Sequence, residues 1–188
     1  MSGHLLPDMT FSLLLLSDFC RTMSGHHTPS FRIGFGYDVH QLAEGEELWL
    51  GGVLVPHSKG AVGHSDADVI LHVICDALLG AANLRDIGYH FPDTDPAYKG
   101  IDSKKLLTEV MLLVRNAGWE LGNLDCTLCL QRPKVLSFIP TMCDTIAATM
   151  GVERNQVSIK ATTTEKLGFV GTEQGVSAHA VVLIQKLI

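Results

Sequence analysis

Residues 31–40, with the sequence FRIGFGYDVH, predict the first β-strand of the chain and one half of a candidate metal site. Side chains two residues apart on a strand point to the same face, so Asp38 and His40 leave this strand together. A carboxylate beside an imidazole suits a metal ion, although this two-residue pattern alone also occurs by chance. A metal site here therefore needs a further ligand from another part of the chain.

Strand and helix signals alternate from residue 31 onward, and no linker interrupts them. A segment rich in Pro, Gly and Asp at residues 85–100 indicates a loop. Ser65 and Asp68 form a capping-box pattern before an apolar helix, and Gly80 follows its last turn. The predicted strands lie at residues 31–40, 48–55, 121–131, 156–162 and 176–187, and the predicted helices lie at residues 65–79, 102–116 and 140–150.

This order of elements predicts an α+β domain of two layers, in which helices cover one face of a mixed β-sheet. It is compatible with a ferredoxin-like sandwich, which we expect here. A length of 188 residues fits one domain, expected at residues 31–188. Residues 1–30 carry no motif and are expected to form an unstructured or weakly ordered extension. Their apolar run at residues 11–16 lacks the basic start of a signal peptide and is too short to cross a membrane.

The composition is that of a globular protein, with 46% hydrophobic and 18% charged residues. The net charge is −6, and the sequence contains no block of Lys or Arg. Nucleic-acid binding depends on clustered cations that neutralise phosphates, so a nucleic-acid partner is not expected. A phosphorylated ligand would have to be held by metal ions and backbone N–H groups instead.

The chain contains five cysteines, an odd number, and no secretory signal accompanies them. Reduced thiols in a cytoplasm-like compartment are therefore expected. Cys126 and Cys129 form a C-x-x-C pattern, but it lies within a predicted strand. Side chains three apart on a strand point to opposite faces, so these two thiols are expected to pack rather than share a metal.

The first predicted helix offers a further ligand for Asp38 and His40. Asp68, His72 and Asp76 recur every four residues and form one polar stripe. One carboxylate and two imidazoles, from Asp38, His40 and His72, would suit zinc and leave its fourth position open for a substrate. A histidine on a half-buried helix is more often a hydrogen-bonded core residue, so the residues alone leave both interpretations open.

Two further segments have both a structural and a functional interpretation. His64 precedes the helix, where free N–H groups favour an anion, but it also fits a plain loop. Residues 160–168, KATTTEKLG, fit a strand end followed by a capping box from Thr162 to Glu165. The same hydroxyl and N–H groups would also hold phosphate oxygens, with Glu165 as a ligand for magnesium.

Six motifs occur along residues 32–188 in one order: GYDVH at 36–40, GHSDADV at 63–69, DALLGAA at 76–82, DIG at 86–88, FPDTDP at 91–96 and KATTTEKLG at 160–168. In these motifs and their order the chain resembles the 2-C-methyl-D-erythritol 2,4-cyclodiphosphate synthase family. The resemblance implies that the 2-phosphate of 4-diphosphocytidyl-2-C-methyl-D-erythritol 2-phosphate attacks the β-phosphorus. A cyclic diphosphate forms and CMP leaves, a lyase reaction in the non-mevalonate route to isoprenoid precursors.

The resemblance also implies a homotrimer with active sites between subunits, in the bacterial cytoplasm rather than a plastid-type organelle. Zinc would be held by Asp38, His40 and His72, and Mg²⁺ or Mn²⁺ by Glu165. His64 and Thr163 match positions that stabilise the transition state. The implied substrate-binding residues are Asp38, His40, His64, Ser65, Asp86, Ile87, Gly88, Phe91, Pro92, Asp93, Thr94, Asp95, Leu130, Gln131, Arg132, Pro133, Lys134, Val135, Leu136, Thr162, Thr163, Thr164, Glu165 and Phe169.

Two other functions are compatible with the same residues. An open zinc site can activate water, so a zinc phosphohydrolase acting on a nucleotide diphosphate is the alternative enzyme. A noncatalytic trimer would need metal only for its fold, but His64, Thr163 and Glu165 speak against it. The chain departs from the family pattern at Thr172 and Gln174, where relatives often have an arginine and an acidic residue.

Overall fold

The structure is a computed structural model that describes residues 30–187. The extension expected at residues 1–30 therefore lies, apart from Ser30, outside the described residues. The elements are β1 (Phe31–Glu44), β2 (Trp49–Leu50), β3 (Val53–Leu54), β4 (Lys59–Val62), α2 (Val69–Ala82), α3 (Ile87–His90), the 3₁₀-helix η1 (Pro96–Tyr98), α4 (Ser103–Asn116), β5 (Trp119–Cys129), α5 (Ile139–Met150), the 3₁₀-helix η2 (Arg154–Gln156), β6 (Val157–Thr162), α6 (Gly168–Gly171) and β7 (Gly175–Lys186).

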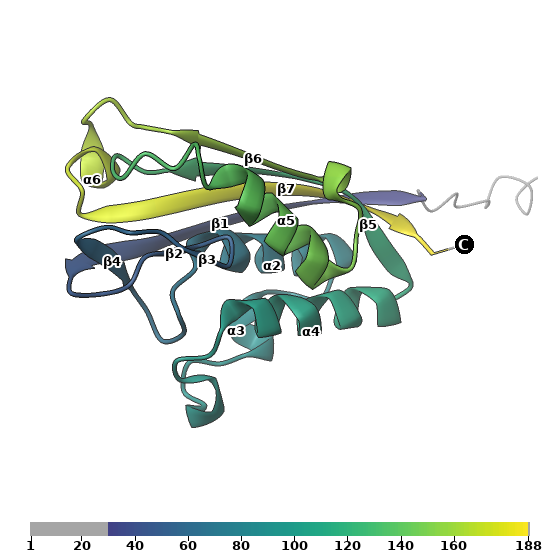
Figure 1. The fold of residues 1–188 in the computed structure, drawn as a ribbon. Coiled ribbons are helices and arrows are strands. Elements are labelled where there is room, and N and C mark those ends of the chain that lie inside the picture. The colour runs from purple at the N-terminus through teal and green to yellow at the C-terminus, as the bar shows by residue number, and fades with distance from the viewer. Residues whose placement is uncertain (1–29, 188) are drawn as a thin grey trace, which may run out of the picture.

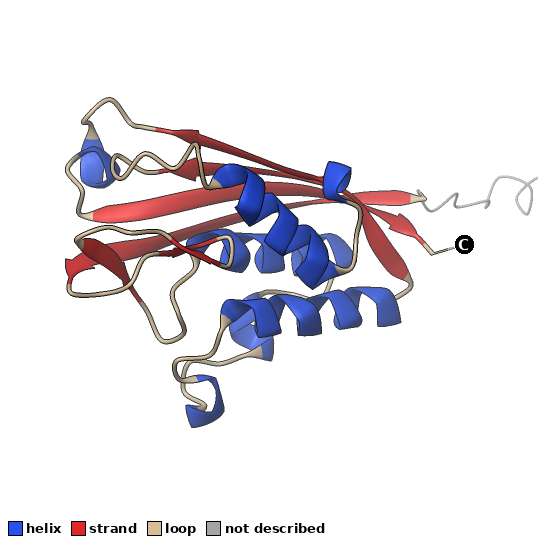
Figure 2. Ribbon diagram, in the orientation of Figure 1, coloured by secondary structure: helices blue, strands red, loops and turns tan. Residues whose placement is uncertain are grey.

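A five-stranded sheet with the order β4-β1-β7-β5-β6 forms one layer, and α2, α4 and α5 lie on one side of it (Figures 1 and 2). Strands β5 and β6 run parallel, and the other neighbours are antiparallel. The predicted α+β class, with helices on one face of a mixed sheet, is confirmed. Within residues 30–187, none of the helices combines the length and apolar character that spanning a bilayer requires.

The element order differs from the β-α-β-β-α-β order of a ferredoxin-like fold. Here α5 connects the neighbouring parallel strands β5 and β6, and the short helix α6 lies between β6 and β7. Strand β7 inserts between β1 and β5, to both of which it is antiparallel. The sequence predicted strands at β1, β5, β6 and β7 but missed the short edge strand β4. Strand order depends on contacts that periodicity does not encode.

Helix α2 begins four residues later than predicted, because Asp68 rather than Ser65 caps it. The Asp68 side chain accepts hydrogen bonds from the backbone N–H groups of Ile70 and Leu71, both at 3.1 Å. It also accepts from Gly51 at 2.9 Å and Gly52 at 2.6 Å, in the turn between β2 and β3. One fully buried carboxylate therefore starts the helix and fastens the β2–β3 hairpin to it.

Other boundaries follow their predicted signals more closely. Asp102 caps α4 by accepting from Lys104 N–H, and Gly151 ends α5 in the left-handed conformation. Residues 48–55 form the β2–β3 hairpin rather than one bent strand. The predicted loop at residues 85–100 contains α3 and η1.

The cysteines of the described chain behave as packing thiols. Cys75, Cys126, Cys129 and Cys143 form no disulfide among residues 30–187, and Cys20 lies outside them. On β5, Cys126 is buried whereas Cys129 is only partly buried, in step with the alternation of the strand. The C-x-x-C pattern therefore has its two side chains on opposite faces, as predicted.

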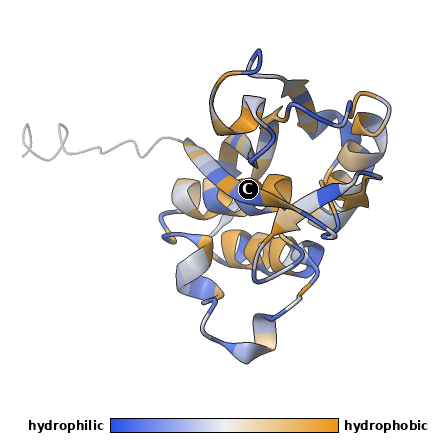
Figure 3. Cartoon of the chain, turned by 90° about the vertical axis from the view of Figure 1, so that its left-hand side faces the viewer, coloured by the Kyte–Doolittle hydropathy of each residue, from blue (hydrophilic) through white to orange (hydrophobic). Residues whose placement is uncertain are grey.

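Two glycines on the helix-facing side of β1 allow α2 to lie very close to the sheet. A Cβ at Gly34 would be 1.9 Å from the Ala77 carbonyl oxygen, and one at Gly36 would be 2.2 Å from the Val73 carbonyl oxygen. No side chain fits such a gap, so these positions require glycine. Hydrophobic residues gather between the helices and the sheet, where they form the core (Figure 3).

The opposite face of β1 is apolar and exposed. Side chains at every second position point away from the helices and keep 43–64% of their surface exposed: Phe31, Ile33, Phe35, Tyr37 and Val39. We call this set the outer face of β1. On β7, its neighbour, Val181 is also 45% exposed. An apolar strip of this kind is typical of a surface that another protein covers.

The close contact between β1 and α2 predicts the effect of Gly36→Ala. The added methyl group meets backbone atoms that cannot yield, so the free energy of unfolding should fall by about 1–3 kcal/mol, as for other overpacked cores. Gly80→Ala is the control, since Gly80 lies on α2 with no atom within 4 Å of its added Cβ. That variant should gain about 0.5–1 kcal/mol. Urea unfolding of both variants measures the difference, and equal stabilities would contradict the close contact.

Candidate functional site

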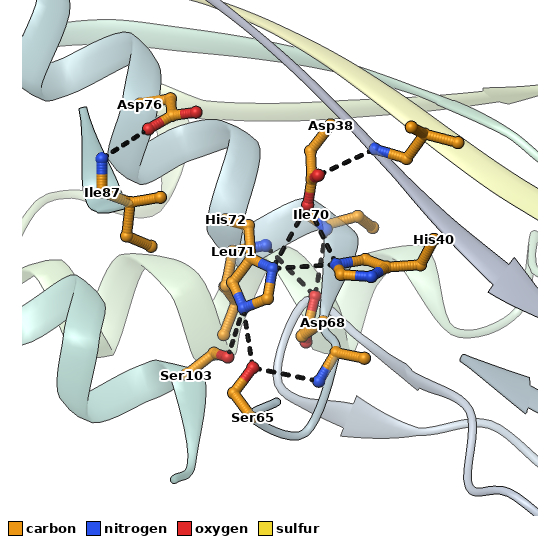
Figure 4. A network of polar contacts seen from close by, with 12 residues as sticks. Asp38, His40, Ser65, Asp68, Ile70, Leu71, His72, Asp76, Ile87 and Ser103 are labelled. Carbon is orange, nitrogen blue, oxygen red and sulfur yellow. Dashed lines mark hydrogen bonds and ion pairs between the residues drawn. The ribbon is translucent and has the colours of Figure 1, made fainter. Parts of the chain in front are cut away.

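Asp38 and His40 on β1 meet His72 from the first turn of α2 (Figure 4). The Asp38 Oδ2 atom lies 3.1 Å from His40 Nε2 and 3.2 Å from His72 Nδ1, and the two ring nitrogens lie 3.0 Å apart. All three side chains are partly buried. Asp38 and His40, predicted on one face of a strand, and His72, predicted on a helix, thus lie side by side.

The spacing of these three atoms fits a tetrahedral metal ion. Ligands about 2.0–2.1 Å from a tetrahedral zinc lie about 3.3 Å from one another, close to the spacing found here. Nitrogen donors favour zinc over magnesium, which prefers oxygen ligands. Among residues 30–187, Asp38, His40 and His72 are the only group of three such side chains close enough to share an ion.

Hydrogen bonds and charges within this triad shift two pKa values. Burial raises the pKa of Asp38, but hydrogen bonds and the charges of His40 and His72 outweigh it and hold the pKa well below its usual range. For His40, burial lowers the pKa and the neighbouring Asp38 raises it, with a net rise. The His40 Nδ1 atom lies 3.1 Å from the Val62 carbonyl oxygen, which can accept its proton and leave Nε2 for a metal.

The other two members of the predicted polar stripe have different roles. Asp68 is the helix cap described above and does not join the triad. Asp76 accepts a hydrogen bond from the Ile87 N–H at 2.8 Å and so ties α3 to α2. Burial raises the Asp76 pKa, and the charges of Asp38 and Asp86 add to the rise while the Ile87 bond opposes it.

A pocket of about 340 Å³ adjoins the triad. It brings together many of the residues predicted to bind a substrate: Asp38, His40, His64, Ser65, Ile87, Gly88, Phe91 and Asp93. Tyr98, Ile101 and Leu106 also line it, and they were missed because they belong to no polar motif. Asp86 and Asp95 instead cap α3 and η1, and neither they nor Pro92 and Thr94 line the pocket.

A second pocket, of about 540 Å³, lies beside β6. It contains predicted residues of the 130–136 and 162–165 segments: Leu130, Pro133, Lys134, Val135, Leu136, Thr162 and Thr163. Gln131 and Arg132 face another hollow together with His57. Strands β7 and β5 separate β6 from β1, and the two pockets share no residue. One chain therefore does not bring His64 and Thr163 into the same pocket.

The segment after β6 forms a turn rather than a new helix, so the capping-box interpretation of Thr162 to Glu165 is wrong. Thr163 Oγ1 donates to Glu165 Oε1 at 3.0 Å, and Thr164 Oγ1 donates to the Leu167 carbonyl at 2.7 Å. The Glu165 side chain is exposed, and within residues 30–187 no hydrogen bond is found to its second carboxylate oxygen. Phe169, in α6, is 42% exposed.

The fold and the site define a class: an α+β protein with a candidate three-ligand metal site beside a pocket. The model of the YgbB family matches residues 31–185, and the chain belongs to that family.

Relatives of known name extend this assignment. A 2-C-methyl-D-erythritol 2,4-cyclodiphosphate synthase of Bacteroides thetaiotaomicron is 63% identical over 155 residues, which are 82% of this chain and 98% of the relative. A synthase of that name solved with CDP bound is 40% identical, with a TM-score of 0.76 over 82% of this chain and all of the other. The bifunctional IspDF of Campylobacter jejuni has a TM-score of 0.81 and 40% identity, and the match covers 84% of this chain and 42% of that one.

The geometry of the triad predicts which substitutions abolish zinc binding. Asp38→Asn, His40→Ala and His72→Ala should each weaken zinc affinity by more than about 100-fold, since losing an outer partner alone costs about 10–100-fold. Asp76→Asn is the control, because its carboxylate contacts Ile87 rather than the triad. Metal content after dialysis, measured by plasma mass spectrometry, tests this. Full zinc retention by His72→Ala would refute the triad.

Proposed function

We propose that this chain converts 4-diphosphocytidyl-2-C-methyl-D-erythritol 2-phosphate into 2-C-methyl-D-erythritol 2,4-cyclodiphosphate and CMP. The observation that carries the proposal is the convergence of Asp38, His40 and His72 beside a pocket lined by the family motifs. The names of the relatives, and the CDP bound to one solved relative, support it.

The two pockets suit the two ends of this substrate. The pocket beside the triad, with its Ile87–Gly88 backbone and Phe91 ring, would hold the methylerythritol phosphate end. The pocket of residues 130–136 would hold the cytidine end, and the hydroxyl groups of Thr162, Thr163 and Thr164 would bind the diphosphate. Bound at both ends, the 2-phosphate is held in line with the β-phosphorus. Positioning of this kind can contribute about 7–11 kcal/mol to lowering the barrier.

The reaction needs no nucleophile from the protein, and the thiols of Cys75 and Cys126 are poor ones. Burial raises the pKa of Cys126 to about 12 and that of Cys75 well above its usual value. Both side chains are fully buried. The donors His64 and Thr163 would instead stabilise negative charge that develops on the phosphates.

The donor sets fit two kinds of metal ion. Zinc on Asp38, His40 and His72 would supply Lewis acidity to a phosphate oxygen. A single exposed carboxylate, Glu165, suits Mg²⁺ or Mn²⁺, because magnesium takes most of its other ligands from phosphates and water. Thr163 orients this carboxylate through the hydrogen bond to Oε1.

A homotrimer would unite the two half-sites. His64 and Thr163 lie on separate pockets of one chain, so a complete site requires a second subunit to bring its 130–136 and 162–165 segments to the triad. The outer face of β1 supplies an apolar surface for such an assembly. The outer face belongs to the same strand as Asp38 and His40 but points to the opposite side of the sheet.

The trimer proposal predicts the effect of a charge on the outer face of β1. Phe35→Asp, at a side chain 63% exposed in one chain, should raise the dissociation constant of the trimer by at least about tenfold, because a carboxylate resists burial. Leu112→Asp is the control, since Leu112 is 46% exposed on α4, in the other layer. Sedimentation of both variants against protein concentration tests this, and a Phe35→Asp trimer as stable as the control would contradict it.

The products decide between the synthase and a zinc phosphohydrolase. Phosphorus NMR of the named substrate with protein, zinc and magnesium should show CMP and a cyclic diphosphate in equal amounts. Glu165→Gln should keep its zinc but lose at least about tenfold in rate, because only the Mg²⁺ or Mn²⁺ ion depends on this carboxylate. Orthophosphate or two monophosphates as main products, without a cyclic species, would assign the protein to the hydrolases.

A further inference from the structure

Both ring nitrogens of His72 have polar neighbours, and the two sets of neighbours differ. Its Nδ1 atom faces Asp38 and His40, whereas Nε2 lies 2.9 Å from Ser103 Oγ and 3.0 Å from Ser65 Oγ (Figure 4). A neutral imidazole that binds a metal through Nδ1 carries its proton on Nε2. The two serine oxygens are therefore the acceptors that select this tautomer.

The two serines differ in what their hydroxyl protons do. Ser103 is fully buried at the first position of α4, and its hydroxyl donates to Asp66 Oδ1. Its backbone N–H donates to Asp66 Oδ2 at 2.9 Å, so the Asp66 carboxylate accepts from both the backbone and the side chain of Ser103. With its proton committed to Asp66, the Ser103 oxygen faces His72 as an acceptor only.

Ser65 is less constrained. Its oxygen accepts from the Ala67 N–H at 3.2 Å and lies near His72 Nε2, and among residues 30–187 no acceptor takes its proton. Ser65 also lines the pocket beside the triad. The Ser65 hydroxyl can therefore donate to a bound molecule, whereas the Ser103 hydroxyl donates to Asp66 and its oxygen faces His72.

We infer that Ser103, oriented by Asp66, is a positioning residue that fixes the tautomer and ring orientation of His72 as a metal ligand. The inference rests on the proposed function only in taking Asp38, His40 and His72 as a zinc site. Hydrogen bonds run in one direction, from His72 Nε2–H to Ser103 Oγ and from Ser103 O–H to the Asp66 carboxylate. A negatively charged end on such a chain makes the opposite ring nitrogen a better electron donor to a metal.

The test is the zinc affinity of the full-length protein, measured by competition with a chromophoric chelator. Ser103→Ala should weaken zinc affinity by about 10–100-fold, the usual effect of losing an outer partner of a metal-bound histidine. Ser103→Thr, which keeps the hydroxyl, should recover most of the loss. Asp102→Ala is the matched control: it removes the cap of α4 at the neighbouring residue without touching His72. Its zinc affinity should change by less than about threefold.

Asp66→Asn tests whether Asp66 acts on His72 through Ser103 or whether the two residues act independently. If Asp66 acts through Ser103, the losses caused by Asp66→Asn and Ser103→Ala should not multiply in the double variant. Cobalt substituted for zinc adds a spectroscopic readout, because its visible absorption reports ligand geometry and should change in Ser103→Ala but not in Asp102→Ala.

Equal losses in Ser103→Ala and Asp102→Ala would mean that α4 acts only by its folding, and multiplicative losses would remove Asp66 from the relay; either result overturns the inference. Tight zinc binding that Ser103→Ala leaves unchanged would also overturn it and leave the proposed function intact. Absence of zinc binding by the unaltered protein would instead count against the metal site itself.

Discussion

The contact between β1 and α2 is the constraint on which the rest of the site depends. Asp38 and His40 lie on a strand paired with β7 over residues 31–41, and His72 lies on a helix. Atoms from the two elements approach to 3.0–3.2 Å, which leaves no room for a looser fit. Gly34 and Gly36 permit that separation by having no side chains, and Asp68 fixes where the helix starts. The close packing of β1 and α2 thus sets the distances between the three candidate metal ligands.

The sequence predicted those parts of the site that depend on one element at a time. The two-residue period put Asp38 and His40 on one face, and the apolar pattern put His72 on a helix. The start of α2 was misplaced because Ser65 and Asp68 are both good caps in isolation. Asp68 becomes the cap in the fold, where the N–H groups of Gly51 and Gly52 also need an acceptor.

Contacts between distant segments could not be predicted either, because they too depend on how separate elements pack together. Ser103 meets His72 across 31 positions, and neither residue signals the other locally. The place of β7 between β1 and β5 likewise follows from how whole strands fit together. The separation of His64 from Thr163 appears only when the strands are in order. The motifs identified the participants of the site, and the tertiary structure assigned them to two different surfaces.

The alternation along β1 has a consequence for how this chain can vary in evolution. Within residues 31–40, two glycines and the candidate metal ligands face the helix layer, and aromatic and branched apolar side chains face away from it. A single inserted or deleted residue would exchange the two sets over the part of the strand that shifts. Phenylalanine rings would then enter the space that two glycines leave for a helix backbone. Point substitutions on the outer face are open to drift among apolar residues, but the length of this segment is not.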